Sequence, residues 1–193
     1  MSAVRKATLA EIGRLCRTAM HAFVDDPVMR WMYPEYESYS EGDGATFDWV
    51  FRRWLAYDET YTTDDCVALA AFIPPGRPEV EVTNAIPVSE HPADRLARFA
   101  AIGTIMAANT PPEPHWYLNL LATHPHWQRQ GLGTMVMQPI VERCDAEGLP
   151  LYLETETEEN VAYYGHLGFT VRDEWDVPLD GPHMWGMIRS PRV

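Results

Sequence analysis

The residues with the clearest chemical potential form a turn at positions 128–134, where Gly131 and Gly133 stand two positions apart. The turn follows the apolar run 117–122 and opens a helical pattern. The glycines let the backbone pass close to a ligand, and the N–H groups of the first helical turn point outward from the helix N-terminus. Such groups attract anions, and the helix macrodipole adds to the attraction. The main-chain N–H groups of residues 130–134 are therefore predicted to bind a pyrophosphate.

Two other phosphate-binding motifs do not fit this turn. A P-loop requires G-x-x-x-x-G-K-[ST], but Gly133 is followed by Thr134 and Met135, with no lysine. A dinucleotide-binding fingerprint requires G-x-G-x-x-G, and the third glycine is missing here. We call this predicted pyrophosphate site, formed by the N–H groups of residues 130–134, the cradle. An ordinary helix-capping turn is the alternative interpretation.

The turn lies within a regular succession of strands and helices. Strands are expected at residues 3–7, 59–63, 66–73, 115–123, 151–155, 169–177 and 184–188. Helices are expected at residues 9–23, 28–32, 46–57, 92–108, 131–147 and 160–167, with a loop at residues 34–44. This order suits an α/β (α+β) fold with a mixed, mainly antiparallel sheet flanked by helices, in one domain over residues 1–193.

Individual residues mark helix beginnings and a helix irregularity. Thr8 and Glu11 have the spacing of a capping box, and Asp26 is expected to cap a helix whose first residue is Pro27. Pro139 lies inside the helix expected at residues 131–147, where it removes a backbone hydrogen bond and should produce a kink.

Three segments together resemble the GNAT superfamily of acyl-CoA-dependent N-acetyltransferases. The turn at 128–134 fits the superfamily signature Q/R-x-x-G-x-G/A, and residues 151–155 and 160–169 complete the pattern. Residues 115–118, 125–133 and 160–169 are most similar to the puromycin N-acetyltransferase-like branch. The resemblance implies the GNAT fold, in which the central strand and the next one splay apart to admit acetyl-CoA as co-substrate.

The resemblance also implies which residues contact acetyl-CoA. Main-chain groups of Leu121, Ala122 and Thr123 would hold the pantetheine arm and polarise the thioester carbonyl. The remaining expected contacts come from the turn, the helix that it opens and the later short helix: Gln128, Arg129, Gln130, Gly131, Leu132, Gly133, Thr134, Asn160 and Tyr164. An exposed arginine without a ligand is the alternative for Arg129, and a helix N-cap is the alternative for Asn160.

Tyr164 occupies the position at which the superfamily carries its tyrosine, so it is expected to protonate the leaving thiolate. The pKa of a phenol is about 10 and that of a thiol is about 8.5. Proton transfer from Tyr164 to the thiolate is therefore unfavourable unless the site shifts one of these two pKa values. The alternative is a core aromatic residue. Tyr163 faces about 100° away on the same helix and is expected to be the core residue of the two.

A base that takes the proton of the amine is harder to assign. Glu154 is the first candidate, because it is a carboxylate inside an apolar run, and His115 and Asn119 on the central strand follow. Glu156, Glu158 and Glu159 are expected to form a solvated acidic loop. No Ser/His/Asp or Cys/His order favours a covalent acetyl-enzyme, so direct transfer in a ternary complex is expected.

Composition limits the partners of the protein. The formal net charge of −13 disfavours nucleic acid and anionic membranes, since no basic stripe is present to neutralise phosphates, and it would attract a cationic amine. No window approaches a membrane span, and no secretory signal is expected in residues 1–16, which are charged throughout and have no apolar h-region. Three scattered cysteines argue for a reducing compartment, so a cytoplasmic protein is expected. His124 and His126 have no third ligand in sequence reach, and no metal site is expected.

The expected function is an acetyl-CoA-dependent N-acetyltransferase that acts on a small-molecule amine. Two alternatives stay open: a regulatory module that binds acyl-CoA without turnover, and a protein N-terminal acetyltransferase. The oligomeric state, a homodimer included, is also open. A hypothetical acceptor pocket would be lined by aromatic residues, for which a hydrophobic core is the alternative: Phe23, Trp31, Tyr33, Phe47 and Trp54.

Overall fold

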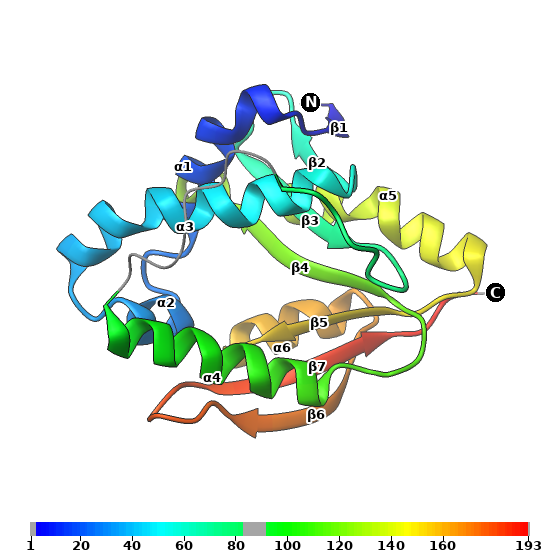
Figure 1. Cartoon of the computed structure of the whole chain (residues 1–193). Helices are drawn as coiled ribbons and strands as arrows, with labels where there is room; N and C mark the ends of the chain where they lie inside the picture. The colour runs from blue at the N-terminus through cyan, green and yellow to red at the C-terminus, as the bar shows by residue number, and fades with distance from the viewer. Residues whose placement is uncertain (1–2, 83–91, 193) are drawn as a thin grey trace.

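The computed structural model describes residues 3–82 and 92–192. Within these ranges, seven strands form one sheet in the spatial order β1-β2-β3-β4-β5-β7-β6 (Figure 1). The strands are β1 (Val4–Lys6), β2 (Thr60–Thr63), β3 (Ala68–Ile73), β4 (Trp116–Thr123), β5 (Leu151–Thr155), β6 (Thr170–Asp176) and β7 (His183–Arg189). Adjacent strands are antiparallel except β4 and β5, so the sheet is mixed and mainly antiparallel, as expected.

The two central strands diverge after a short parallel ladder. Trp116 pairs with Leu151 and Tyr117 with Tyr152, and both strands then continue without further pairing to each other. Figure 1 shows β4 and β5 close together at one end and separated at the other. On the opposite edge of β4, a bulge leaves Asn119 without a partner on β3. The predicted splay is therefore present, and it leaves main-chain groups of the distal half of β4 available on the β5 side.

Six α-helices in the described part of the chain cover the sheet. They are α1 (Ile12–Ala22), α2 (Pro27–Met32), α3 (Tyr36–Ala56), α4 (Ala93–Asn109), α5 (Leu132–Glu147) and α6 (Glu158–His166). Figure 1 places α3 and α4 in front of the sheet and α5 and α6 behind it. The order of strands and helices along the chain is the order predicted from the sequence.

The alternation of side chains along the strands builds a core on each face. On β3, Ala68, Ala70 and Phe72 pack into the cluster that includes residues of α5 and α6. Leu69 and Ala71 point the other way, into the cluster with α1 and α3. Because β3 is buried on both faces, its sequence is a continuous run of apolar residues.

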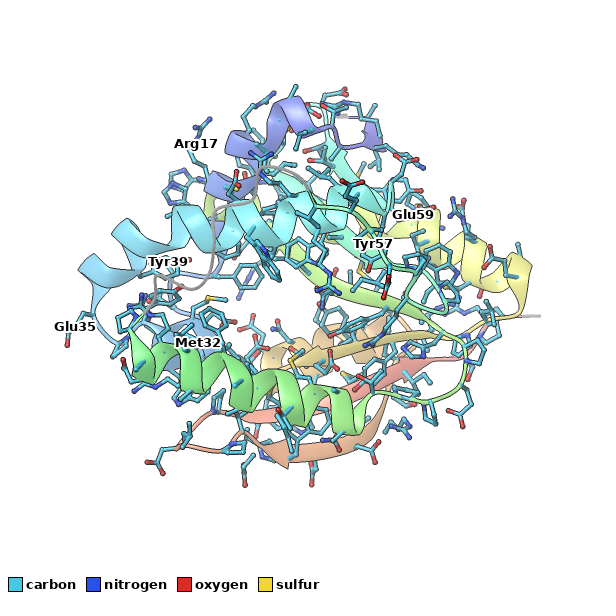
Figure 2. All side chains as sticks on the ribbon, in the orientation of Figure 1. Arg17, Met32, Glu35, Tyr39, Tyr57 and Glu59 are labelled. Atoms are coloured by element: carbon cyan, nitrogen blue, oxygen red, sulfur yellow. The ribbon has the colours of Figure 1, made fainter. Side chains whose placement is uncertain are left out.

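A third cluster closes the end of the molecule near α2 and α4. Met32, Tyr39, Ile102 and Met184 are buried in it, which joins both helices to β7. Figure 2 shows the side chains of this region, with Met32 and Tyr39 labelled. The burial of Tyr39 in this cluster explains why the loop predicted at residues 34–44 is helical.

The loop expected at residues 34–44 is largely helical, because α3 begins at Tyr36. Gly42 and Gly44 each lower helix propensity by about 1 kcal/mol, which is why the segment was predicted as a loop. Tyr39 is buried, and its hydroxyl donates a hydrogen bond to the Met20 carbonyl at 2.6 Å. This tertiary anchor at one end of α3 outweighs local propensity.

The predicted helix caps are confirmed. Glu11 accepts hydrogen bonds from the N–H of Thr8 at 3.0 Å and from its hydroxyl at 2.9 Å, and this capping box opens a 3₁₀ turn, η1 (Leu9–Glu11), ahead of α1. Asp26 caps α2 by accepting a hydrogen bond from the Met29 N–H at 2.9 Å. Pro139 lies inside α5, which continues past it to Glu147.

None of the helices in the described ranges has the length and apolar character that crossing a membrane requires.

Candidate active site

The turn before α5 has the geometry of an anion-binding helix N-terminus. Gly131 is its N-cap with φ of 79°, a left-handed conformation that glycine adopts without steric cost. The first return hydrogen bond of the helix runs from Met135 N–H to Gly131 C=O at 3.0 Å. The N–H groups of the residues between them therefore have no partner within the helix.

Gly133 is required by close packing rather than by backbone conformation. A Cβ at this position would lie 3.1 Å from the Tyr163 hydroxyl oxygen and 3.6 Å from Thr123 Oγ1. The Tyr163 hydroxyl also lies 3.2 Å from Thr134 Oγ1, in the first turn of α5. The first helical turn is thus packed against α6 and the end of β4, with little room for a side chain.

Replacement of Gly133 by Val should weaken acetyl-CoA binding by about tenfold or more, because the added methyl groups must enter the space in front of the N–H groups. Isothermal titration calorimetry with acetyl-CoA measures the effect. Gly165→Ala is the matched control, because a Cβ there meets nothing within 4 Å and the residue lies on α6. Equal affinities of the wild type and Gly133→Val would contradict the role of this turn.

The cradle opens into one cavity of about 440 Å³. All the residues predicted to contact acetyl-CoA line it except Ala122 and Gln130. Gln130 is exposed beside the cavity, and the Ala122 side chain is buried in the core with α1 and α3. Ala122 pairs with Leu69, and the His124 N–H two residues later donates to the Val67 carbonyl on the β3 side. Main-chain groups alternate between the two edges of a strand, so those of Ala122 face β3, whereas those of Leu121 and Thr123 face the β5 side.

Gln128 and Arg129 have different surroundings in the turn. Gln128 Nε2 donates a hydrogen bond to the Thr123 carbonyl at 3.1 Å and so ties the turn to the end of β4. Arg129 has a side chain that is 88% exposed, and it forms an ion pair with the equally exposed Glu159 at 3.2 Å. Exposed pairs of this kind contribute little to stability.

Asn160 lies in the first turn of α6 rather than at its cap. Its N–H donates to the hydroxyl of Thr157 at 3.2 Å, and Thr157 is the N-cap. The helix begins at Glu158, two residues before the predicted start, because the threonine hydroxyl supplies the cap. The N-cap interpretation of Asn160 is wrong, and its side chain is left to the cavity that it lines.

Tyr164 is both a core residue and part of the cavity wall. It is 8% exposed, and its ring packs edge-on against Phe169 at 5.6 Å between centroids. Burial raises its pKa well above 10, with smaller contributions from Tyr163 and Glu156. Tyr163 is less buried and reaches α5 with its hydroxyl, so the expectation that Tyr163 is the core residue of the pair is wrong.

Glu154 lies on β5 with one carboxylate oxygen bound and the other unsatisfied. Oε2 accepts a hydrogen bond from the Tyr117 hydroxyl, while Oε1 is buried without a partner. Burial raises the pKa of Glu154 to about 7, although the hydrogen bond from Tyr117 acts in the opposite direction. A carboxylate with this pKa exchanges its proton near neutral pH, as a general base must.

His115 stands apart from the cradle at the start of β4. Its Nδ1 donates to the Glu113 carbonyl at 2.7 Å, Nε2 is buried without a partner, and burial lowers the pKa of the imidazole. Its ring contacts Tyr152, with 5.6 Å between centroids. Neither His115 nor Glu154 lines the cavity that contains Tyr164.

Glu156 is the residue of the site that the sequence interpretation missed. It is half-buried and lines the cavity with Asp26, whereas Glu158 and Glu159 are exposed as expected. Burial and the neighbouring Asp26 both raise the pKa of Glu156, so at neutral pH this carboxyl holds a proton. The two-residue spacing from Glu154 is the signal that pointed to a shared face.

The aromatic residues of the hypothetical acceptor pocket mostly belong to the core. Tyr33, Phe47 and Trp54 are buried at 7% exposure or less. Trp54 Nε1 donates to Asn119 Oδ1 at 2.6 Å, which anchors the bulge of β4 to α3. Phe23 does line the cavity. For the three buried residues, the core interpretation holds.

Over residues 3–82 and 92–192, no group of three or more histidine, cysteine, aspartate or glutamate residues is arranged to hold a metal ion.

The fold and the cradle agree with a family match. Residues 26–169 match the acetyltransferase (GNAT) family, and the chain belongs to that family. Its members are N-acetyltransferases that use acetyl-CoA as co-substrate. The closer resemblance to puromycin N-acetyltransferase-like proteins stays a prediction.

Individual relatives are more distant. An uncharacterized N-acetyltransferase of Schizosaccharomyces pombe is 36% identical over 85 residues, which cover 40% of this chain and 32% of the relative, so the chain spans about a third of that protein. A Corynebacterium glutamicum structure described as histone acetyltransferase HPA2 and related acetyltransferase has a TM-score of 0.71 at 21% identity, covering 100% of this chain and 98% of that one. The NatC complex bound to Gag peptide and CoA has a TM-score of 0.57 at 13% identity, with 100% of both chains covered.

Proposed function

We propose that this protein is an acetyl-CoA-dependent N-acetyltransferase that transfers the acetyl group directly to the amine of a small molecule. The observation that carries the proposal is the single cavity that joins the N-terminus of α5, the distal half of β4 and Tyr164. A pyrophosphate at the helix N-terminus directs the pantetheine arm along β4 into the splay, where the thioester meets the acceptor.

The main chain supplies most of the cofactor site. The N–H groups of residues 130–134 bind the pyrophosphate, and those of Leu121 and Thr123, which face the β5 side, bind the pantetheine arm and stabilise the oxyanion that forms at the thioester carbonyl. Removal of one such donor costs about 3 kcal/mol in other enzymes. Asn160 and Gln128 border the same space and orient the cofactor.

The chemical step needs one proton acceptor and one donor. Glu154, which lies on β5 outside the cavity, removes a proton from the ammonium group of the acceptor through an intervening water molecule. The free amine nitrogen then attacks the thioester carbonyl carbon. The C–N bond forms and the C–S bond breaks. The thiolate accepts a hydrogen bond from the Tyr164 hydroxyl and takes the second proton that the attacking nitrogen loses. The products are the acetylated amine, CoA and one proton. Because burial raises the pKa of Tyr164, its hydroxyl stays protonated and serves as a hydrogen-bond donor throughout.

Acidic residues at the cavity support a cationic small-molecule acceptor. Asp25, Asp26 and the protonated Glu156 all line it, in a protein with a net charge of −13. The raised pKa of Glu156 means that an arriving cation displaces the proton held between Glu156 and Asp26 and takes its place. Amines with a second cationic group fit this arrangement.

Glu156→Gln should raise the KM for a cationic acceptor about tenfold with little change in acetyl-CoA affinity, since glutamine cannot lose a proton to balance the cation. Steady-state kinetics with varied acceptor measure the effect. Glu158→Gln, an exposed neighbour, is the control. Equal KM values for Glu156→Gln and the wild type would show that Glu156 does not face the acceptor.

The function itself is tested by measuring CoA release from acetyl-CoA with aminonucleosides, polyamines, amino acids and peptides. Turnover with a small amine supports the proposal. Turnover with peptides alone would identify a protein N-terminal acetyltransferase. Tight acetyl-CoA binding without turnover on any amine would identify a regulatory module.

A further inference from the structure

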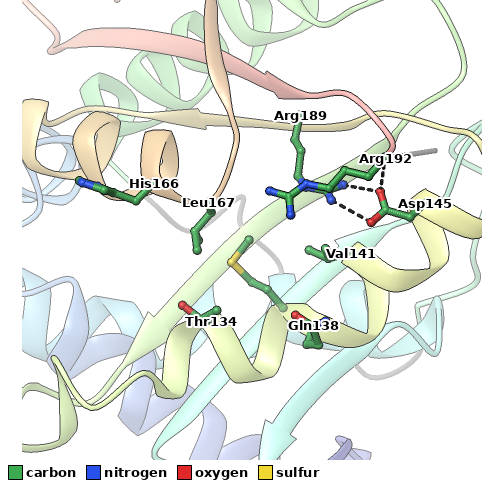
Figure 3. A pocket seen from close by; sticks show the side chains of 9 residues that line it. Thr134, Gln138, Val141, Asp145, His166, Leu167, Arg189 and Arg192 are labelled. Carbon is green, nitrogen blue, oxygen red and sulfur yellow. Dashed lines mark hydrogen bonds and ion pairs between the residues drawn. The ribbon is translucent and has the colours of Figure 1, made fainter.

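A second cavity, of about 300 Å³, lies between α5 and α6 beside the end of β7 (Figure 3). Thr134 lines both this cavity and the one at the cradle, so the second begins where the pyrophosphate site ends. Its other charged or titratable lining residues are Asp145, His166, Arg189 and Arg192. The function proposed above gives this cavity no role.

The charges at this cavity are not balanced. Arg189 is 3% exposed and donates to Asp145 through Nη1 and Nη2, at 2.8 and 2.9 Å. The main-chain N–H of Arg192 also donates to Asp145, at 2.7 Å. Asp145 is therefore occupied by Arg189 and by the chain end, and the guanidinium charge of Arg192 remains (Figure 3).

The side chain of Arg192 extends to the C-terminal end of α6. A Cβ at Gly168 would lie 3.3 Å from Arg192 Nη2, and Gly168 has φ of 92°. The hydrogen bonds from Arg189, together with the charge of Arg192, lower the pKa of Asp145, but no salt bridge within 4.0 Å involves the Arg192 guanidinium in the described ranges. His166, one turn after Tyr163, donates from Nδ1 to the Ala162 carbonyl at 2.7 Å, which leaves Nε2 for another partner.

Acetyl-CoA carries a second phosphate group that a cation near the cradle would bind. Besides the pyrophosphate, it carries a 3′-phosphate on the ribose, with a charge of about −2 at neutral pH as for other phosphomonoesters. The protein has a net charge of −13, and Arg129 in the cradle is already paired with Glu159. On the other side of α5, an open cavity lined by Met135 and Pro139 has Glu142 as its charged residue, which repels phosphate.

We propose that the cavity between α5 and α6 receives the 3′-phosphate of CoA, with Arg192 as its counter-charge and His166 as a second contact. This inference rests on the proposed function for the identity of the ligand. Arg192, three residues after β7, would then select CoA over forms of the cofactor that lack this phosphate.

The test compares the dissociation constants of CoA and 3′-dephospho-CoA for the wild type and for Arg192→Ala, measured by calorimetry. The wild type should prefer CoA by about tenfold, and Arg192→Ala should lose most of this preference while its affinity for 3′-dephospho-CoA stays unchanged. Because the alanine keeps the main-chain N–H that binds Asp145, the fold should be retained, and the melting temperature checks this.

Arg172→Ala is the matched control, because this arginine lies on β6 and pairs with Asp173. It should keep the wild-type preference, whereas His166→Gln should reduce it. No preference in the wild type, or the same preference in Arg192→Ala, would overturn the inference. Failure of the proposed function looks different: the preference for CoA would persist while no amine is acetylated.

Discussion

Tyr164→Phe is expected to lower kcat about a hundredfold while leaving acetyl-CoA affinity and the melting temperature almost unchanged. The phenylalanine ring keeps the contact with Phe169 in the core, so the substitution removes the hydroxyl alone. Without that donor, the developing thiolate loses its hydrogen bond, and removal of one donor that stabilises transition-state charge typically costs about 10²- to 10³-fold in kcat. Single-turnover measurements of CoA release separate this step from product release.

The neighbouring tyrosine supplies the control for this experiment. Tyr163→Phe removes a hydroxyl that lies beside Thr134, at the cofactor cradle. It should weaken acetyl-CoA binding modestly and leave the chemical step intact. A Tyr164→Phe variant with wild-type kcat would show that Tyr164 is a packing residue. A large drop in kcat for Tyr163→Phe alone would show that Tyr163, and not Tyr164, assists the leaving thiolate.

The second large effect concerns Glu154 and pH. The wild-type rate should fall about tenfold for each pH unit below 7, since a base must be deprotonated and burial raises the pKa of Glu154 to about 7. Glu154→Gln should lower kcat/KM about a hundredfold. The ratio of wild-type to variant rates should rise with pH up to about 7 and then level off. Taking the ratio cancels the titration of the acceptor amine itself.

Stability provides an independent readout for the same variant. The folded pKa of Glu154 lies above its ordinary value, so folding favours the protonated carboxyl and becomes less favourable as pH rises toward 7. Glu154→Gln should therefore unfold at a higher temperature than the wild type at pH 8. His115→Gln is the kinetic control and should keep the pH dependence. Loss of that dependence in His115→Gln, with its retention in Glu154→Gln, would make His115 the base.

Local chemistry was sufficient for much of the fold. The capping box at Thr8 and Glu11, the Asp26 cap and the left-handed Gly131 all depend on residues within about one helical turn of one another. The order of strands and helices follows from apolar periodicity in the same way. For this reason the sequence predicted the cradle, and nearly all the residues predicted to bind the cofactor line one cavity.

One error concerns a distant contact, and another concerns a local helix cap that the sequence interpretation did not use. The start of α3 is decided by the hydrogen bond of Tyr39 to Met20 on α1, against the local propensity of two glycines. The start of α6 depends on the Thr157 hydroxyl, and the two-residue difference changes which side chains of its first turn meet α5.

By itself, then, the sequence determined the class of fold, the glycine turn that we propose binds the cofactor and the chemistry that is available beside it. Only the tertiary structure decided which of Tyr163 and Tyr164 is buried, that Glu156 faces the cavity with Asp26, and that Glu154 lies against Tyr117. These outcomes depend on the rotation of α6 against α5 and on the separation of β4 from β5. Both are set by packing between residues far apart in the chain, and no short sequence pattern contains that information.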